Sequence, residues 1–120
     1  RTICLGNPKQ KLKDIYKAVE FAQKWSIKNI KSGIIIADHV KSVHDILRKK
    51  GFGKYLKHTL GHGVGTRIHE SPKLSQKNRR MLKENMVVTI EPGLYINGLG
   101  GVRIEDMLII KKKGSEVITK

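Results

Sequence analysis

Three histidines and two glutamates in the second half of the chain are the side chains best suited to chemistry. His58, His62 and His69 lie within twelve positions of one another, and Glu91 and Glu105 each fall in a predicted strand close to glycine or proline. An unpaired carboxylate is costly to bury, so such glutamates need a partner. A cation would supply one.

Imidazole nitrogens combined with carboxylate oxygens, and with no thiolate, suit Mn, Co, Zn or Fe(II). Mixed nitrogen and oxygen ligands also recur in two-metal hydrolases. The same residue types and spacing are explained equally well without a metal, if the strand glutamates are paired with Lys or Arg and the histidines lie on the surface. Both explanations stay open at this level.

Three glycines surround the first of the candidate ligands: Gly61 and Gly63 flank His62, and Gly65 follows. Glycine allows close backbone approach and torsions barred to other residues. We expect both properties to be used here, because a metal site needs backbone close to the ion. An ordinary glycine-rich loop is the alternative.

Two helices are predicted before this region. Apolar residues recur at three and four positions over residues 8–31 and again over residues 37–50, which indicates amphipathic helices with lysines outside. Gly33 and Gly51 are placed to end them. Asn7 is the expected N-cap of the first helix.

The remaining patterns predict strands. Residues 1–5 read as the end of a strand with Cys4 buried in it, and the second half of the chain reads as a mostly antiparallel sheet. Its predicted strands are 86–90, 94–96, 102–110 and one around 117–118, with turns at 97–98 and 113–114. The expected architecture is α+β, in one domain spanning residues 1–120.

The formal charge of +15 invites a nucleic-acid partner. Its distribution argues against one, because the lysines are scattered, only six of the 25 basic residues are Arg, and aromatic residues make up 5%. Another explanation of the positive charge is a separate acidic portion of the protein that balances it. The single cysteine excludes a disulfide framework, and no apolar run approaches the roughly 20 residues of a membrane span. We expect a cytoplasmic protein with no membrane or nucleic-acid partner.

Three segments carry a resemblance to a known family: GHGVGTRIHE (61–70), TIEPGLYI (89–96) and GGVRIED (100–106). In order and spacing they resemble the signatures of the pita-bread metallopeptidases, most closely the Xaa-Pro dipeptidase (prolidase) and aminopeptidase P branch. RTICLGNP at the start resembles the family's strand-to-helix junction, so the resemblance covers essentially the whole chain. It implies the C-terminal half of a pita-bread catalytic domain, with the N-terminal half absent.

The resemblance also implies a metal site. His62 matches a ligand of one metal, Glu105 a carboxylate that bridges two metals, and Glu91 a ligand that also handles protons. The implied cofactors are two divalent ions, with Mn or Co favoured and Zn or Fe as alternatives. The implied reaction is hydrolysis of Xaa-Pro peptide bonds by metal-activated water.

Further matches lie on the substrate side. His69 matches the histidine that hydrogen-bonds the substrate and stabilises the tetrahedral intermediate, and His58 matches a second substrate-side histidine. Arg103 matches an arginine near the metals and the substrate pocket. Together with Glu91, His58 and His69 are the catalytic candidates, and the implied substrate is a peptide with proline in second position.

The resemblance has gaps. Two aspartate ligands would be expected shortly before Arg1, and Asp106 should face away from the metals because strand neighbours alternate. Thr59 and Thr66 also depart from the family's usual residues. We therefore expect this chain alone to bind metal weakly, or as a single ion, and to be inactive. A homodimer or a separate N-terminal half would complete the fold, and a non-catalytic relative that acts as a binding module is the alternative.

Overall fold

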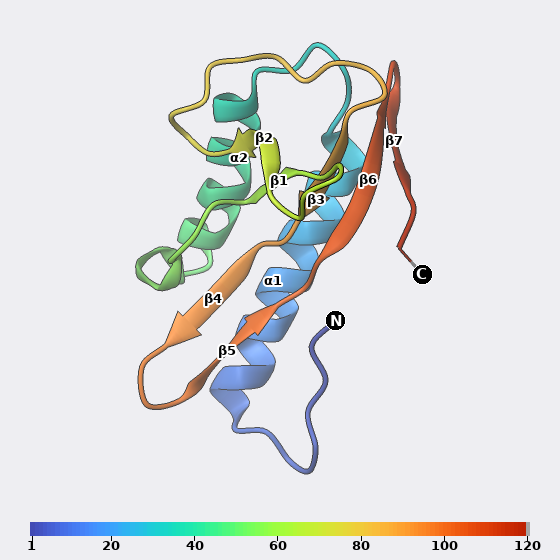
Figure 1. The fold of residues 1–120 in the computed structure, drawn as a ribbon. Helices are drawn as coiled ribbons and strands as arrows, with labels where there is room; N and C mark the ends of the chain where they lie inside the picture. Colours follow the sequence, from blue (N-terminus) through green and yellow to red (C-terminus); the bar gives the residue numbers. More distant parts are fainter. Residues whose placement is uncertain (120) are drawn as a thin grey trace.

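The computed structural model describes residues 1–119 and shows two helices followed by seven strands (Figure 1). The helices are α1 (Gln10–Asn29) and α2 (Ile36–Lys49), and a short 3₁₀ helix η1 (Gly53–Tyr55) follows them. The strands are β1 (Gly61–Gly63), β2 (Glu70–Leu74), β3 (Val87–Ile90), β4 (Gly93–Ile96), β5 (Gly100–Arg103), β6 (Asp106–Lys111) and β7 (Gly114–Val117).

The strands form two antiparallel sheets. Five of them lie in the order β2-β1-β3-β6-β7, and β4 and β5 form a separate two-stranded ribbon. Helix α1 runs behind both sheets, and α2 lies beside it near β2 (Figure 1). The α+β class and the mostly antiparallel sheet are confirmed.

The helices follow their apolar periodicity. Gly33 and Gly51 have φ of 87° and 81°, the left-handed conformation that glycine adopts without strain. Gly51 directly follows the C-cap of α2 as predicted, whereas α1 ends at Asn29 with Ile30 as its C-cap, so the prediction that Gly33 ends the first helix is wrong. The start of α1 differs from the prediction. Lys9, rather than Asn7, is the N-cap residue, and no side chain caps this end.

The predicted strand at residues 1–5 is wrong. This segment has no strand pairing, Ile3 is 83% exposed, and Cys4 is exposed rather than buried. Its contact with the sheets runs through Thr2, whose hydroxyl lies 2.5 Å from the carbonyl oxygen and 3.2 Å from the amide nitrogen of Arg103. Apolar composition alone cannot make a strand, because a strand also needs a neighbour with which to pair.

The predicted strand at 102–110 is two strands in two sheets. β5 pairs with β4, whereas β6 pairs with β3 and β7, and the chain changes partner at Ile104 and Glu105. Pro92 makes the matching break between β3 and β4, because proline has no N–H to donate to a ladder. The predicted turn at 97–98 is confirmed, whereas the second turn lies at 112–113, one residue before the predicted 113–114, and Gly114 begins β7.

Strand β2 was not predicted. It contains Pro72, which argues against a central strand, but β2 lies at the edge of the five-stranded sheet, where proline is tolerated. It pairs with β1 through Gly61 and Leu74 and through His62 and Lys73. The strand that contains the first candidate ligand is therefore held on both sides.

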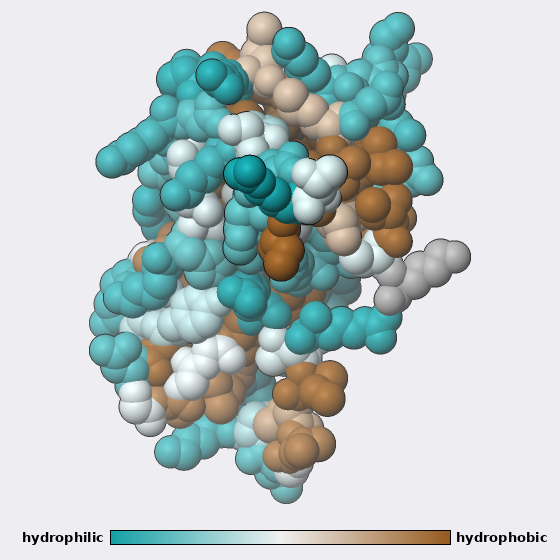
Figure 2. Space-filling model, viewed as in Figure 1, coloured by the Kyte–Doolittle hydropathy of each residue, from teal (hydrophilic) through white to brown (hydrophobic). Residues whose placement is uncertain are grey.

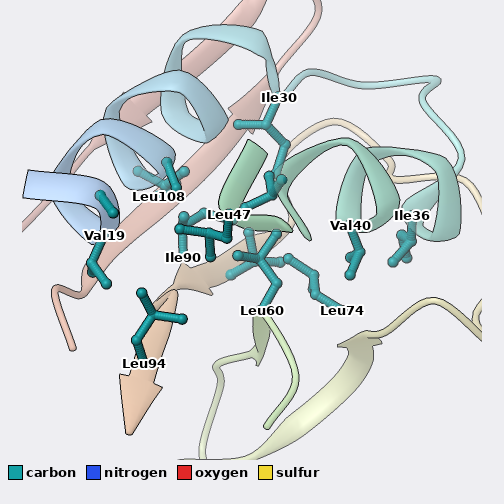
Figure 3. Packing of buried hydrophobic residues seen from close by; sticks show 14 of the residues in the cluster. Val19, Ile30, Ile36, Val40, Leu47, Leu60, Leu74, Ile90, Leu94 and Leu108 are labelled. Carbon is teal, nitrogen blue, oxygen red and sulfur yellow. The ribbon is translucent and has the colours of Figure 1, made fainter. Parts of the chain in front are cut away.

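The hydrophobic core lies directly behind the predicted site. Leu60, Leu74 and Ile90 are almost completely buried and point into one cluster with Leu47 of α2 (Figure 3). Leu60 immediately precedes β1, and Ile90 ends β3. Their burial anchors the ends of both strands that carry the candidate metal ligands.

Some large apolar side chains remain at the surface. Figure 2 shows brown hydrophobic areas over β7 and over the N-terminal segment, where Val117, Ile118, Ile3 and Leu5 are exposed. Within residues 1–119, no helix has the length and apolar character needed to cross a bilayer.

Candidate metal and substrate site

A cleft of about 1030 Å³ gathers most of the predicted site residues. Its lining includes His58, His62, His69, Glu91 and Arg103. These side chains come from four separate parts of the chain, which β1, β3 and β5 bring together. The cleft is the structural counterpart of the site predicted from the motifs.

His62 and Glu91 form the centre of this cleft. His62 lies in the middle of β1, and Glu91 is the first residue after β3, whose Val88 pairs with Gly63. Nε2 of His62 lies 3.2 Å from Oε1 of Glu91, and the two side chains are only 14% and 12% exposed. The sheet therefore brings an imidazole and a carboxylate into direct contact in a largely dry place.

The orientation of the His62 ring determines which species can lie between His62 and Glu91. Nδ1 lies 2.9 Å from the carbonyl oxygen of Gly63, which can only accept a hydrogen bond, so Nδ1 carries a proton. In the neutral ring the lone pair of Nε2 then faces a carboxylate oxygen of Glu91. Two acceptors repel unless a positive species lies between them, either a proton or a metal cation. The donor set fits a divalent ion that accepts nitrogen and oxygen ligands.

The Thr89 hydroxyl touches both members of the pair. It accepts a hydrogen bond from the amide of His62 at 3.0 Å and donates one to Oε1 of Glu91 at 3.1 Å. Thr89 was not singled out from the sequence, although it belongs to the TIEPGLYI segment.

Arg103 lies on the other side of Glu91. Its Nε is 3.8 Å from Oε2, and its side chain is 51% exposed, so it borders the cleft as predicted and makes a loose ion pair. The Thr2 hydroxyl holds the backbone of Arg103 from the N-terminal segment.

His69 reaches the pair from the loop between β1 and β2. It is exposed, and its ring centroid lies 4.3 Å from that of His62. The loop is shaped by Glu70, whose Oε1 accepts hydrogen bonds from the amide of Arg67 at 2.8 Å and the hydroxyl of Thr66 at 3.3 Å. The structure thus brings His69 beside His62, and its substrate-binding role stays a prediction.

His58 is held by its neighbours. Nδ1 donates to the carbonyl oxygen of Thr59 at 2.7 Å, which leaves Nε2 to accept from the hydroxyl of Tyr95 at 3.1 Å. The two rings meet edge to face with centroids 5.4 Å apart. Tyr95 is a second residue that the sequence analysis missed, and its place in the TIEPGLYI segment was the signal available.

Glu105 lies outside this cluster. It is exposed in the break between β5 and β6 and does not line the cleft, so the prediction of a glutamate within a strand is wrong. Within residues 1–119, no group of three His, Cys, Asp or Glu side chains is close enough to hold a metal. Asp106 binds Gln23 and Thr119, as expected of a residue that faces away from the site.

Gly61, Gly63 and Gly65 are needed because a side chain would not fit at these positions, not because their backbone torsions are unusual. A Cβ on Gly61 would lie 1.9 Å from the carbonyl oxygen of Thr89, and one on Gly63 would lie 2.2 Å from that of Ser71. A Cβ on Gly65 would meet the Glu70 carboxylate at 2.4 Å. The glycines with positive φ lie elsewhere in the chain, so the prediction of unusual torsions here is wrong. The close contacts that Gly61 and Gly63 allow are with the backbone of neighbouring strands, and the predicted approach of backbone to a metal stays a prediction.

Comparison with known proteins bears on the family and on the fold. The model of metallopeptidase family M24 matches residues 1–112. Curated Xaa-Pro dipeptidases from Pyrococcus horikoshii and Pyrococcus furiosus are 47% and 46% identical over 120 residues. These matches cover 100% of this chain and 34% of each relative. The chain therefore spans about a third of the length of these relatives.

Solved structures show the same similarity. A prolidase from Pyrococcus furiosus matches with a TM-score of 0.97 at 46% identity, covering 100% of this chain and 36% of that protein. An X-Pro aminopeptidase from Thermotoga maritima matches with a TM-score of 0.94 at 36% identity, covering 98% of this chain and 34% of its own. The two helices and the antiparallel sheets reproduce part of these folds.

Proposed function

From the premise that the chain belongs to metallopeptidase family M24, we propose that the protein containing it hydrolyses Xaa-Pro peptide bonds. Identity of 47% to an Xaa-Pro dipeptidase and the pita-bread fold shared with prolidases support this assignment. The proposed substrate is a peptide with proline in second position. The observation that carries the proposal is the contact of His62 with Glu91 at 3.2 Å, in a cleft that also contains His58 and His69.

We propose His62, Glu91 and Glu105 as metal ligands. His62 and Glu91 already converge, whereas Glu105 would have to turn toward the cleft from its exposed position. When bound, divalent ions, Mn or Co first and Zn or Fe as alternatives, supply Lewis-acid activation of water and of the peptide carbonyl. Glu91 is the proposed proton carrier.

The histidines act on the substrate in this proposal. His69, exposed beside His62, would donate a hydrogen bond to the carbonyl oxygen as negative charge develops there. His58, which also lines the cleft, would contact the substrate there. Arg103 makes a loose ion pair with Oε2 of Glu91 and would border the substrate pocket.

The chain corresponds in this proposal to a single domain, residues 1–120, that forms the C-terminal part of the catalytic domain. The two aspartate ligands implied by the resemblance would come from outside these 120 residues, so the chain alone would bind metal weakly or as one ion and would not turn over substrate. An N-terminal half or a second copy of the chain would cover the exposed apolar side chains over β7 and the N-terminal segment. We place the protein in the cytoplasm.

A second candidate function is a non-catalytic relative that serves as a binding module. The exposed position of Glu105, which does not line the cleft, favours it. Such a protein would keep the fold without a complete ligand set.

Hydrolysis assays separate the two candidates. The protein containing this chain should cleave an Xaa-Pro dipeptide in the presence of Mn²⁺ and should spare the matching Xaa-Ala dipeptide, and His62→Ala should abolish cleavage. The 120-residue chain alone should show none. A full-length protein that binds Mn²⁺ but cleaves neither dipeptide would favour the binding module, and turnover by the 120-residue chain would refute its proposed inactivity.

A further inference from the structure

The side chain of Thr89 is placed between the two converging site residues. It is only 3% exposed, and its hydroxyl lies 3.0 Å from the amide nitrogen of His62 and 3.1 Å from Oε1 of Glu91. A hydroxyl has one proton and two lone pairs, so it can accept from the amide and donate to the carboxylate at the same time. One buried group therefore connects the backbone of β1 to the side chain that follows β3.

We propose that Thr89 is a positioning residue that fixes His62 and Glu91 relative to each other, so that both can bind the same cation. The inference rests on the proposed function only in taking this pair as metal ligands. Thr89 itself touches neither the metal nor the substrate. It acts through the two hydrogen bonds of its hydroxyl.

The local packing explains why a hydroxyl at this position reaches the neighbouring strand. Gly61 allows β1 to approach so closely that any Cβ there would lie 1.9 Å from the carbonyl oxygen of Thr89. The backbone amide of Glu91 is then bound by the carbonyl of Leu60 at 2.8 Å. The backbones on both sides are fixed, and the Thr89 hydroxyl adds the contact that orients the carboxylate.

Other partners hold the carboxylate less firmly. Besides His62 and Thr89, Arg103 also lies near Glu91, but its Nε is 3.8 Å from Oε2 and half of its side chain is in water. A long, exposed contact of this kind is easily exchanged for water. The shorter and buried bond from Thr89 is the better constraint on the angle at which Oε1 faces the imidazole.

Hydrogen-bond partners of metal ligands orient those ligands, and removing one typically costs roughly 10–100-fold in metal affinity. Thr89→Val keeps the shape of the side chain and removes the hydroxyl. Thr89→Ser keeps the hydroxyl. Ile90→Val is the matched control, because it loosens the same buried strand without touching either hydrogen bond.

The test uses the full 120-residue chain and two measurements. Amide hydrogen exchange by NMR reports the bond between His62 and Thr89 without any metal, and titration with Mn²⁺ followed by electron paramagnetic resonance reports the cation site. In Thr89→Val, we expect the His62 amide to exchange faster relative to the other amides of β1, and the Kd for Mn²⁺ to rise roughly 10–100-fold. Thr89→Ser should restore both values, and Ile90→Val should change neither selectively.

Unchanged exchange at His62 in Thr89→Val would overturn the proposal. So would a loss of Mn²⁺ affinity that Ile90→Val shows equally, because Thr89 would then only support the strand. If the 120-residue chain does not bind Mn²⁺ measurably, the Mn²⁺ titration is made with the same three variants of the protein that contains this chain. Neither measurement requires hydrolysis, so a protein that shows this pattern but cleaves no Xaa-Pro dipeptide contradicts the proposed function and leaves the role of Thr89 intact.

Discussion

The Nε2 atom of His39 lies 2.8 Å from the hydroxyl of Ser26, and this contact is buried between α2 and α1. Trp25 stacks on the His39 ring with centroids 5.8 Å apart and an interplanar angle of 23°. Burial lowers the pKa of His39 from 6.5 to about 4. The interface of the two helices therefore requires an uncharged imidazole.

This requirement predicts a loss of stability in acid. Above pH 6.5 the ring is neutral whether the chain is folded or unfolded, whereas between pH 6.5 and 4 only the unfolded chain binds the proton. The free energy of unfolding should fall by about 3 kcal/mol over this window, since each pKa unit contributes about 1.4 kcal/mol. Urea unfolding at several pH values measures it.

The control for this prediction is the double variant Ser26→Ala with His39→Leu, which removes both partners and leaves no buried hydroxyl unpaired. Burial and Arg48 also lower the pKa of His44, so some acid sensitivity should remain in the control. If the double variant loses stability with falling pH as steeply as the parent, His39 is not the cause.

A second prediction concerns the spacing of β1 and β3. In Gly61→Ala the new methyl group would lie 1.9 Å from the backbone oxygen of Thr89, which cannot move aside as a side-chain end can. We expect a loss of about 3 kcal/mol or somewhat less in unfolding free energy, typical of overpacking. The His62 and Glu91 resonances should also shift in NMR spectra.

Gly98→Ala is the matched comparison for Gly61→Ala. A Cβ at Gly98 meets no atom within 4 Å, but the φ of 72° is unfavourable for alanine. It should cost about 1–2 kcal/mol through the backbone alone and leave the His62 resonances in place. Equal effects of both variants on His62 would show that close approach is not the reason for Gly61.

How well the sequence predicts each element depends on whether that element is determined by neighbouring residues or by residues far away in the sequence. The two helices follow from local periodicity and were predicted nearly to the residue, as was Gly51 at the end of the second helix. The strand expected at residues 1–5 and the division of 102–110 depend on pairing partners, which composition does not reveal. An apolar run shows that a segment can pair, but not with which neighbour.

The same distinction holds for the site. His62, Glu91, His69 and His58 were found because their residue types and motif spacing carry information. Thr89 was missed because its partner His62 is 27 positions away in sequence and its hydroxyl has no chemistry of its own to attract notice. Positioning residues of this kind become visible only when the strands are placed side by side.

A third prediction follows from the hydrogen bond of Tyr95 to His58. Because Nδ1 of His58 donates to the carbonyl oxygen of Thr59, the neutral ring should carry its proton mainly on Nδ1 while Tyr95 donates to Nε2. In Tyr95→Phe the proportion with the proton on Nε2 should rise, and stability should fall by about 1 kcal/mol. Ring ¹⁵N chemical shifts measure the tautomers.

Tyr55→Phe is the control for the tautomer measurement. It also removes a phenolic hydroxyl, but from η1, where Tyr55 packs on Phe52 and makes no recorded contact with His58 within residues 1–119. The His58 tautomers should be unchanged in this variant. If Tyr95→Phe leaves them unchanged as well, Tyr95 does not orient the ring.

The last prediction separates two adjacent carboxylates. Asp106 is bound by Gln23 and Thr119, so Asp106→Asn should lower the unfolding free energy by about 1–3 kcal/mol. Glu105 is exposed, so Glu105→Gln should change stability by about 0.5 kcal/mol or less. In the protein containing this chain, the proposed ligand role predicts that Glu105→Gln nevertheless weakens Mn²⁺ binding tenfold or more, by roughly 1.4 kcal/mol.

Calorimetric titration with Mn²⁺ and urea unfolding of the same samples distinguish these effects, because each substitution should move a different quantity. Asp106→Asn should keep metal affinity once the variant is folded, and Glu105→Gln should keep stability. A tight metal site that Glu105→Gln leaves unaltered would show that the ligand assignment is wrong. The cation would then depend on His62 and Glu91 with partners other than Glu105.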